Sequence, residues 1–207
     1  MKPILPALLF ASCLALSSAH ADASVSTATE TRGYWEMVYP IFEGDEAEIK
    51  AAINADLYLR AYRSVNDGEK NASRRLDYKL MREDDHYLSL LFFLSRYEAG
   101  EENPVHRVYA FGVVYDKTTG EEVPLSRLAD VTVEELIRLQ RAGHFYRCDG
   151  TPIPTEHIQG QPQRVPKDYF LNDRGQIFVL FSPDLLARPA DGITAIDVTD
   201  LKKPNAF

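Results

Sequence analysis

The sequence has few of the features that identify an enzyme. Its 207 residues include only 2 cysteines and 5 histidines. It has no Gly-x-Ser-x-Gly elbow, no His-Glu-x-x-His pair, no Gly-rich phosphate loop and no dinucleotide fingerprint. Serine hydrolases, zinc proteases and nucleotide-dependent enzymes therefore have no support in the motifs. We expect a protein without enzymatic activity, catalytic residues, bound metal or cofactor.

Positive charge is also scarce. Lys and Arg number 23 against 31 Asp and Glu, which gives a formal net charge of −8. Binding to a phosphate backbone needs clustered Lys and Arg, so nucleic acid is excluded as a partner class. An acidic protein is better suited to a basic protein partner, which its field attracts.

Long hydrophobic runs are absent after the first residues of the chain. Lys2 precedes an apolar stretch over 4–16, and Ala19-His20-Ala21 offers the small-x-small pattern of a signal peptidase site. The apolar stretch is too short to span a bilayer core of about 30 Å. We therefore predict a signal peptide over 1–21, cleavage near Ala21, and a periplasmic or secreted protein without a membrane span. A lipid anchor at Cys13, which follows Phe10-Ala11-Ser12, is the alternative.

The remainder of the chain predicts one flexible segment and one folded domain. Residues 22–33 are small and polar, typical of a flexible lead-in, and 34–207 are predicted as a single α+β domain. A helix is predicted over 45–63 because Ile49, Ile53, Leu57 and Ala61 recur at every fourth position. A second, shorter helix follows the N-cap Thr132 and runs over 133–142. Strand patterns occur at 34–39, 76–80, 87–97, 105–115, 121–125, 176–181 and 192–198.

The order of these elements favours a mainly antiparallel sheet, because most strands follow one another without an intervening helix. The predicted fold is thus α+β, with one long N-terminal helix and a second shorter helix packed on the sheet. Residues 176–181 are apolar on both faces, which predicts a central strand with Phe178 and Leu180 on one face and Val179 and Phe181 on the other. Residues 144–166, rich in Pro and Gly, predict a long surface loop.

Two arrangements offer alternatives to a purely binding protein. His86 and His106 could meet across a sheet and share a metal ion. Cys148 could act as a nucleophile with His144 or His157 as its base, as in an unrecognised hydrolase. Neither arrangement has the spacing typical of such sites.

The segment between the two longest predicted strands combines carboxylates with aromatic side chains. Such a combination suits binding to a basic protein surface or to a sugar. The alternative is an ordinary solvent-exposed loop with no binding role. The predicted ligand-binding residues are Tyr97, Glu98, Glu101, Glu102 and His106.

Several short motifs together resemble an exported domain of poorly characterised function. They are Tyr39-Pro40-Ile41 before a helix with Ile53-Asn54, the stretch from Tyr97 to His106, Tyr115-Asp116 through Gly120, Val123 through Leu128, and Arg188 through Gly192. The resemblance covers about residues 34–199. The family includes the ectodomain of lysozyme-sensing anti-sigma factors and the non-catalytic region of peptidoglycan deacetylases.

The resemblance implies a role in the cell envelope, with a lysozyme-like muramidase as the ligand. The alternative is a glycan-binding accessory module, whose ligand would be peptidoglycan. This chain departs from the family because it has no transmembrane segment and no deacetylase domain, so signalling and deacetylation are not expected of it. The family's Gly-Gly-Ala-His turn is replaced by Glu101 through Val105 before His106.

Overall fold

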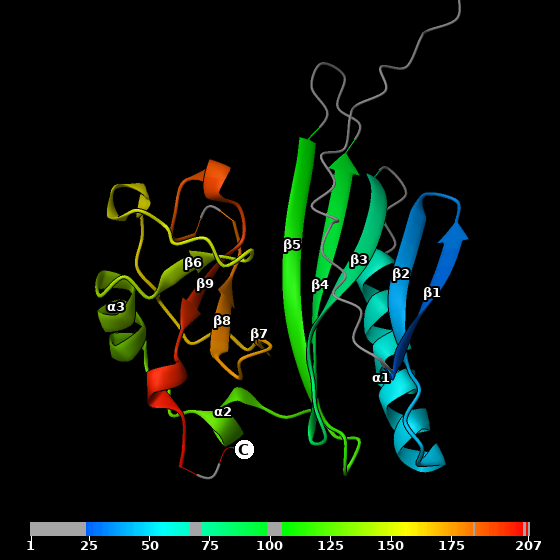
Figure 1. The fold of residues 1–207 in the computed structure, drawn as a ribbon. Coiled ribbons are helices and arrows are strands. Elements are labelled where there is room, and N and C mark those ends of the chain that lie inside the picture. Colours follow the sequence, from blue (N-terminus) through cyan, green and yellow to red (C-terminus); the bar gives the residue numbers. More distant parts are fainter. Residues whose placement is uncertain (1–23, 67–71, 99–104, 184, 205, 207) are drawn as a thin grey trace, which may run out of the picture.

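The computed structural model describes residues 24–66, 72–98, 105–183, 185–204 and 206. The predicted signal peptide with Cys13 lies outside the described residues, and so do Glu101 and Glu102. Within the described part, the chain forms two β-sheets and three α-helices (Figure 1). None of the described helices is long and apolar enough to cross a membrane.

The first sheet has five strands in chain order. They are β1 (Val25–Arg32), β2 (Trp35–Phe42), β3 (Ala72–Glu83), β4 (Tyr87–Glu98) and β5 (Val105–Asp116). Every neighbouring pair is antiparallel except β2 and β3, which are parallel because helix α1 (Ala47–Val65) connects them.

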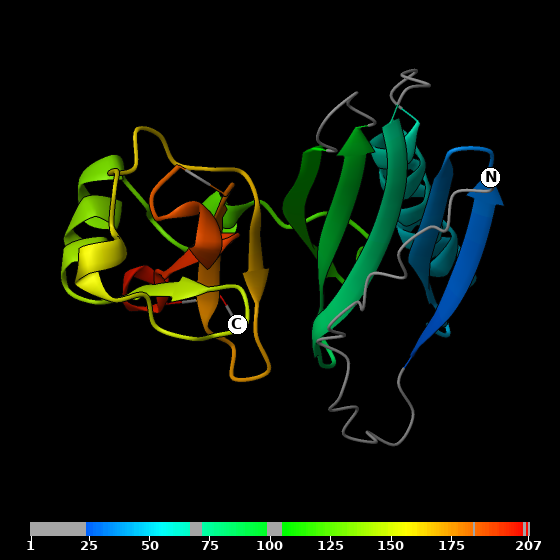
Figure 2. The ribbon, with the colours of Figure 1, turned by 90° about the horizontal axis from the view of Figure 1, so that it is seen from above.

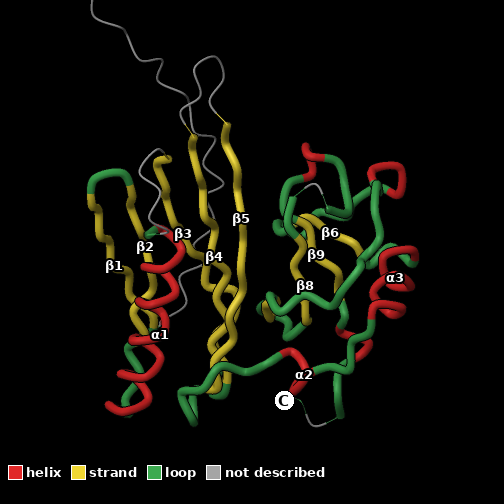
Figure 3. Tube along the Cα trace, turned by 180° about the vertical axis from the view of Figure 1, so that it is seen from behind, coloured by secondary structure: helices red, strands yellow, loops and turns green. Residues whose placement is uncertain are grey.

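Helix α1 covers one face of the first sheet (Figures 2 and 3). Its predicted stripe is buried, with Ile53, Leu57 and Ala61 inaccessible to solvent. Asn54 fastens the helix to the end of β2, since its side chain accepts the N–H of Phe42 at 2.7 Å and donates to the C=O of Phe42 at 2.9 Å.

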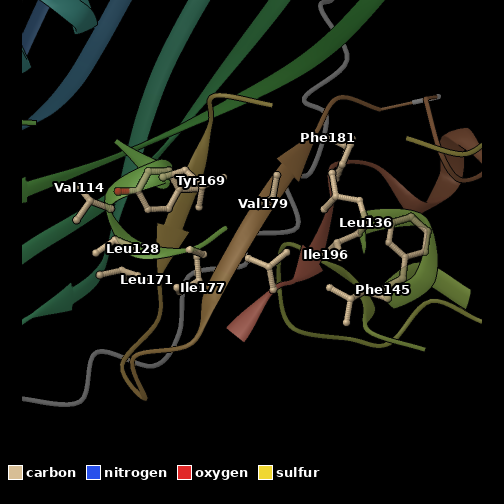
Figure 4. Packing of buried hydrophobic residues seen from close by; sticks show 14 of the residues in the cluster. Val114, Leu128, Leu136, Phe145, Tyr169, Leu171, Ile177, Val179, Phe181 and Ile196 are labelled. Atoms are coloured by element: carbon tan, nitrogen blue, oxygen red, sulfur yellow. The ribbon is translucent and has the colours of Figure 1, made fainter. Parts of the chain in front are cut away.

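The second sheet has four antiparallel strands in the order β6-β9-β8-β7. They are β6 (Phe145–Arg147), β7 (Tyr169–Leu171), β8 (Ile177–Phe181) and β9 (Thr194–Asp197). Helix α3 (Val133–Arg141) packs against β6 and β9, helix α2 (Leu125–Leu128) lies at the end of the sheet (Figure 1), and both contribute to an apolar core around Phe145, Ile177 and Ile196 (Figure 4). Three short 3₁₀ turns complete the layer: η1 (Thr155–His157), η2 (Pro189–Asp191) and η3 (Thr199–Leu201).

The two sheets meet on the face of the first sheet that lies opposite α1. Leu91 of β4 packs with Phe170 and Leu180 of the second sheet in a small cluster. Gly112 of β5 permits this close approach, because a Cβ atom there would lie 2.0 Å from the carbonyl oxygen of Tyr169.

Several predictions are confirmed. The fold class is α+β, the helices predicted at 45–63 and 133–142 correspond to α1 and α3, and the N–H of Glu135 donates to Oγ1 of the N-cap Thr132 at 3.2 Å. Strand β8 lies inside its sheet, with Phe178 and Leu180 facing the first sheet and Val179 and Phe181 facing the helices.

Other predictions are wrong. Residues 25–32 are not a flexible lead-in, because the whole of β1 pairs with β2 across a turn in which Gly33 adopts a φ of 55°. The strand predicted at 34–39 does not stop before Pro40 but continues to Phe42; beyond Met37 it pairs only with β1, so a proline is tolerated. Residues 121–125 form a single bridge to Tyr115 rather than a strand. The strands divide into two sheets, and the shorter helix packs on the second.

Candidate functional site

Tyr97 and His106 form an aromatic pair near one end of strands β4 and β5. Tyr97 of β4 lies directly opposite His106 of β5, and their rings stack with centroids 4.2 Å apart and planes within 5°. Directly opposed residues of antiparallel strands are held about 5 Å apart, so the sheet itself sets this contact. The histidine is exposed and the tyrosine half-buried. A rigid scaffold thus presents one aromatic unit to solvent.

A charged network lies on the same face of the sheet. Arg75 of β3 donates from Nε to Asp77 at 2.8 Å and from Nη1 to Glu36 of β2 at 3.3 Å. The hydrogen bond to Asp77 raises the pKa of Arg75. Since Arg75 pairs with the residue two before Tyr97, the network lies diagonally beside the aromatic pair.

Glu98 is separated from the aromatic pair. Consecutive strand residues face opposite sides, so Glu98 points away from the face that carries Tyr97. Its carboxylate pairs with Nε of Arg96 at 2.9 Å, and Arg107 lies opposite Arg96 on β5. Of the five predicted ligand-binding residues, the structure therefore brings two together and places one on the other face.

The alternative of a metal site shared by His86 and His106 is wrong. The two strands are antiparallel, with Tyr87 opposite Asp116 and Tyr97 opposite His106. The histidines are therefore about ten residues apart along the sheet, roughly 33 Å at 3.3 Å per residue. Among the described residues, no group of three His, Cys, Asp or Glu side chains is arranged to hold a metal ion.

The alternative of a Cys148 nucleophile has no support either. Cys148 packs against the small cluster between the sheets, and burial raises the pKa of its thiol to about 12. At neutral pH the thiol stays protonated and is a poor nucleophile. His157, which would serve as its base, instead lies with Nδ1 3.1 Å from both carboxylate oxygens of Asp191.

Asp191 is the centre of a charged cluster that the sequence does not indicate. Its carboxylate has no exposed surface. It accepts hydrogen bonds from Nε of Arg147 at 3.2 Å and from Nδ1 of His157 at 3.1 Å. Nε of Arg188 lies 3.5 Å from the same carboxylate. The hydrogen bond from Arg147 holds the pKa of Asp191 at about 2. The cluster ties β6 to η1 and η2, so the predicted surface loop 144–166 is fixed to the second sheet. The sequence indicated His157 as a candidate base and the stretch from Arg188 to Gly192 as part of the family resemblance, but it did not indicate that they meet at Asp191.

A groove of about 730 Å³ opens between α2 and the segment before β7. Its lining is mainly apolar and includes Leu125, Val131, Pro166 and Tyr169, with Glu122 at the margin. Glu122 is paired with Arg60 of α1.

No family model matches the sequence, and no curated protein matches it. The solved structures with a similar fold include a member of the DUF3298 family from Bacteroides fragilis NCTC 9343 and a DUF3298 family protein from Pseudomonas aeruginosa PAO1. The first is 10% identical, has a TM-score of 0.57, and the match covers 87% of this chain and 93% of that chain. The second is 13% identical, with a TM-score of 0.57 and coverage of 88% and 94%. At this identity the likeness shows the fold alone.

Proposed function

We propose that this chain, which has the fold of the DUF3298 proteins, is an exported, non-enzymatic binding domain of the bacterial cell envelope. Its proposed partner is a basic protein such as a lysozyme-like muramidase, and its proposed contact residues are Tyr97 and His106. The family resemblance of the sequence suggests this partner class, and the fold is compatible with it.

The observation that carries the proposal is the stacked pair itself. Aromatic side chains that are rigid before binding lose little conformational entropy on association and often act as anchors in protein interfaces. Tyr97 and His106 are fixed by strands of 12 residues each, paired along their full length. The pair therefore combines a partly exposed aromatic surface with a rigid support.

The overall charge favours a basic partner. Removal of residues 1–21 would take away Lys2 and no acidic residue, which changes the net charge from −8 to −9. Such a charge accelerates encounter with a cationic protein, and salt weakens the effect.

The test is a calorimetric titration of lysozyme into the protein that lacks residues 1–21. We expect wild type to bind and a Tyr97→Ala/His106→Ala variant to lose at least about tenfold in affinity, the effect of removing a modest hot spot. Tyr58→Ala is the matched control, since Tyr58 is 37% exposed on α1, remote from the pair. A Glu98/Glu101/Glu102→Gln variant should mainly slow association. If wild type fails to bind at roughly tens of micromolar, the lysozyme proposal is excluded.

A glycan-binding accessory module is the second candidate. It is favoured by the network of Glu36, Arg75 and Asp77 beside the Tyr97 ring, because sugar sites combine an aromatic surface with polar groups. Ionic strength separates the two candidates. Association with a basic protein should weaken as salt increases, whereas stacking of Tyr97 on peptidoglycan fragments should change little.

A further inference from the structure

β5 is an outer strand of the first sheet, so one side of its backbone faces away from β4. Three contacts identify the residues that turn outward. The N–H of Asp116 donates to the C=O of Glu121 at 2.9 Å, and the C=O of Val114 accepts the N–H of Val123 at 2.7 Å. The N–H of Gly112 donates to the carboxylate of Asp168.

The same side of the backbone continues toward the start of β5. In an antiparallel strand the N–H and C=O of every second residue point to the same side. His106, Val108 and Ala110 therefore turn their backbone groups outward, as Gly112, Val114 and Asp116 do. The chain's own segments bind the later part of this edge, whereas no described residue bonds to the outward groups from His106 to Ala110.

This open part of the edge lacks most of the devices that prevent strand pairing, and Arg107 is the one Lys, Arg, Asp or Glu side chain on it. Natural edge strands are protected by Pro, by Lys or by a β-bulge. Residues 105–110 contain no Pro or Lys, and their register with β4 is uninterrupted. Val105 and Tyr109, with 42% and 37% of their surfaces exposed, lie on it.

The side chains along this edge form a pattern. Val105, Arg107 and Tyr109 lie on the face that carries Phe111, the one opposite to the face of His106 and Tyr97. All three are exposed. The order is apolar, basic, apolar; Arg96, directly across from Arg107 on β4, is paired with Glu98, so Arg107 is the basic group that this edge presents.

We propose that residues 106–110 of β5 bind an extended segment of a partner protein by strand addition. The complementary segment alternates apolar, any residue, acidic, any residue, apolar. Its backbone bonds to His106, Val108 and Ala110, its carboxylate lies opposite Arg107, and its apolar side chains lie against Val105 and Tyr109. This site is distinct from the Tyr97–His106 pair, because its side chains lie on the other face of the sheet.

The probe is an acetylated, amidated and fluorescently labelled peptide, Thr-Val-Thr-Glu-Thr-Val-Thr, whose binding is followed by anisotropy. We expect wild type to bind it and Val108→Pro to lose detectable binding. Proline removes one outward N–H and leaves the bonds to β4, which come from the alternate residues. Arg107→Glu should weaken binding about fivefold, and a peptide with Lys in place of Glu should recover that loss.

Circular dichroism shows whether Val108→Pro is folded. If it is not folded, the proposal is tested by the charge exchange alone, in which Arg107→Glu is titrated with the Glu peptide and the Lys peptide. Equal peptide affinities of wild type and folded Val108→Pro would overturn the proposal, as would the absence of any charge exchange effect. A dimer of the wild type that Val108→Pro abolishes in analytical ultracentrifugation would also overturn it, since the occupant of the edge would then be a second copy of the chain.

Discussion

The carboxylate of Asp191 shows how one residue can organise a long connection. A buried charge is tolerated only when other groups replace its hydration. Arg147, His157 and Arg188 do so from three separate segments. Because Arg147 is the last residue of β6, His157 is the last residue of η1 and Arg188 directly precedes η2, their convergence fixes the path of the chain between β6 and β9.

We predict that Asp191→Asn destabilises the protein in a pH-dependent manner. The pKa of Asp191 is about 2 in the folded protein, below its ordinary value of 3.8. Its stabilising effect is therefore complete above the ordinary value and is lost as the pH falls toward about 2. Urea unfolding should show a lower free energy of unfolding for the variant near neutral pH, and a narrowing difference below about pH 4.

The matched control for this prediction is Asp200→Asn, because Asp200 is exposed. It should unfold like the wild type at every pH. A constant difference between wild type and Asp191→Asn across the acid range would contradict the assigned ion pairing.

Elements with strong local patterns are those that the sequence predicts. Helix α1 has four apolar residues at helical spacing, and β8 is an unbroken apolar run, so both follow from local sequence. β1 does not, because its Thr-rich sequence is stabilised by pairing with β2 rather than by burial. Strands β6 and β7 have three residues each, too few for a periodic signal, and the division into two sheets depends on pairing of β6 with the distant β9. For the site, the sequence indicates which residues lie at the ends of the two strands, whereas the register of β4 and β5 decides that Tyr97 and His106 meet and that Glu98 lies on the other face.

At β8 we predict that Leu180→Asp prevents soluble folding. Leu180 is 4% exposed and faces the first sheet, so an aspartate there would bury an unpaired charge. The cost is about 3–5 kcal/mol, a large part of the stability of a typical domain. Leu185→Asp is the control, since Leu185 is 52% exposed, and its free energy of unfolding should change by about 0.5 kcal/mol or less. Circular dichroism and solubility of the two variants provide the measurement, and a soluble, folded Leu180→Asp protein would contradict the placement of β8.

The described residues of the molecule form two large apolar cores and a smaller apolar cluster between the two sheets. One core lies between α1 and the first sheet, and the other lies between the second sheet and the helices α2 and α3. Residues near the end of the chain strengthen the junction. The hydroxyl of Tyr87, at the start of β4, donates to the C=O of Ala206 at 2.9 Å.

Tyr87→Phe tests this junction. The substitution keeps the ring and leaves the buried carbonyl of Ala206 without the hydroxyl donor, so we expect a loss of about 1–2 kcal/mol in the free energy of unfolding. Tyr109→Phe, at a side chain that is 37% exposed, should change it by about 0.5 kcal/mol or less. Urea unfolding of both variants is the measurement, and equal stabilities would show that the contact between Tyr87 and Ala206 contributes little.

Later segments of the chain bind part of the outer edge of β5, and this has a consequence for the order in which the protein folds during synthesis. A chain that emerges from its N-terminus completes β1 to β5 before the segments at Glu121–Val123 and Asp168 are available to bind that edge. During this interval the entire outer side of β5 is open to unwanted pairing with other chains. A chaperone that holds β5 until residue 168 has emerged should therefore raise the yield of folded protein, and slow emergence of the second half should lower it.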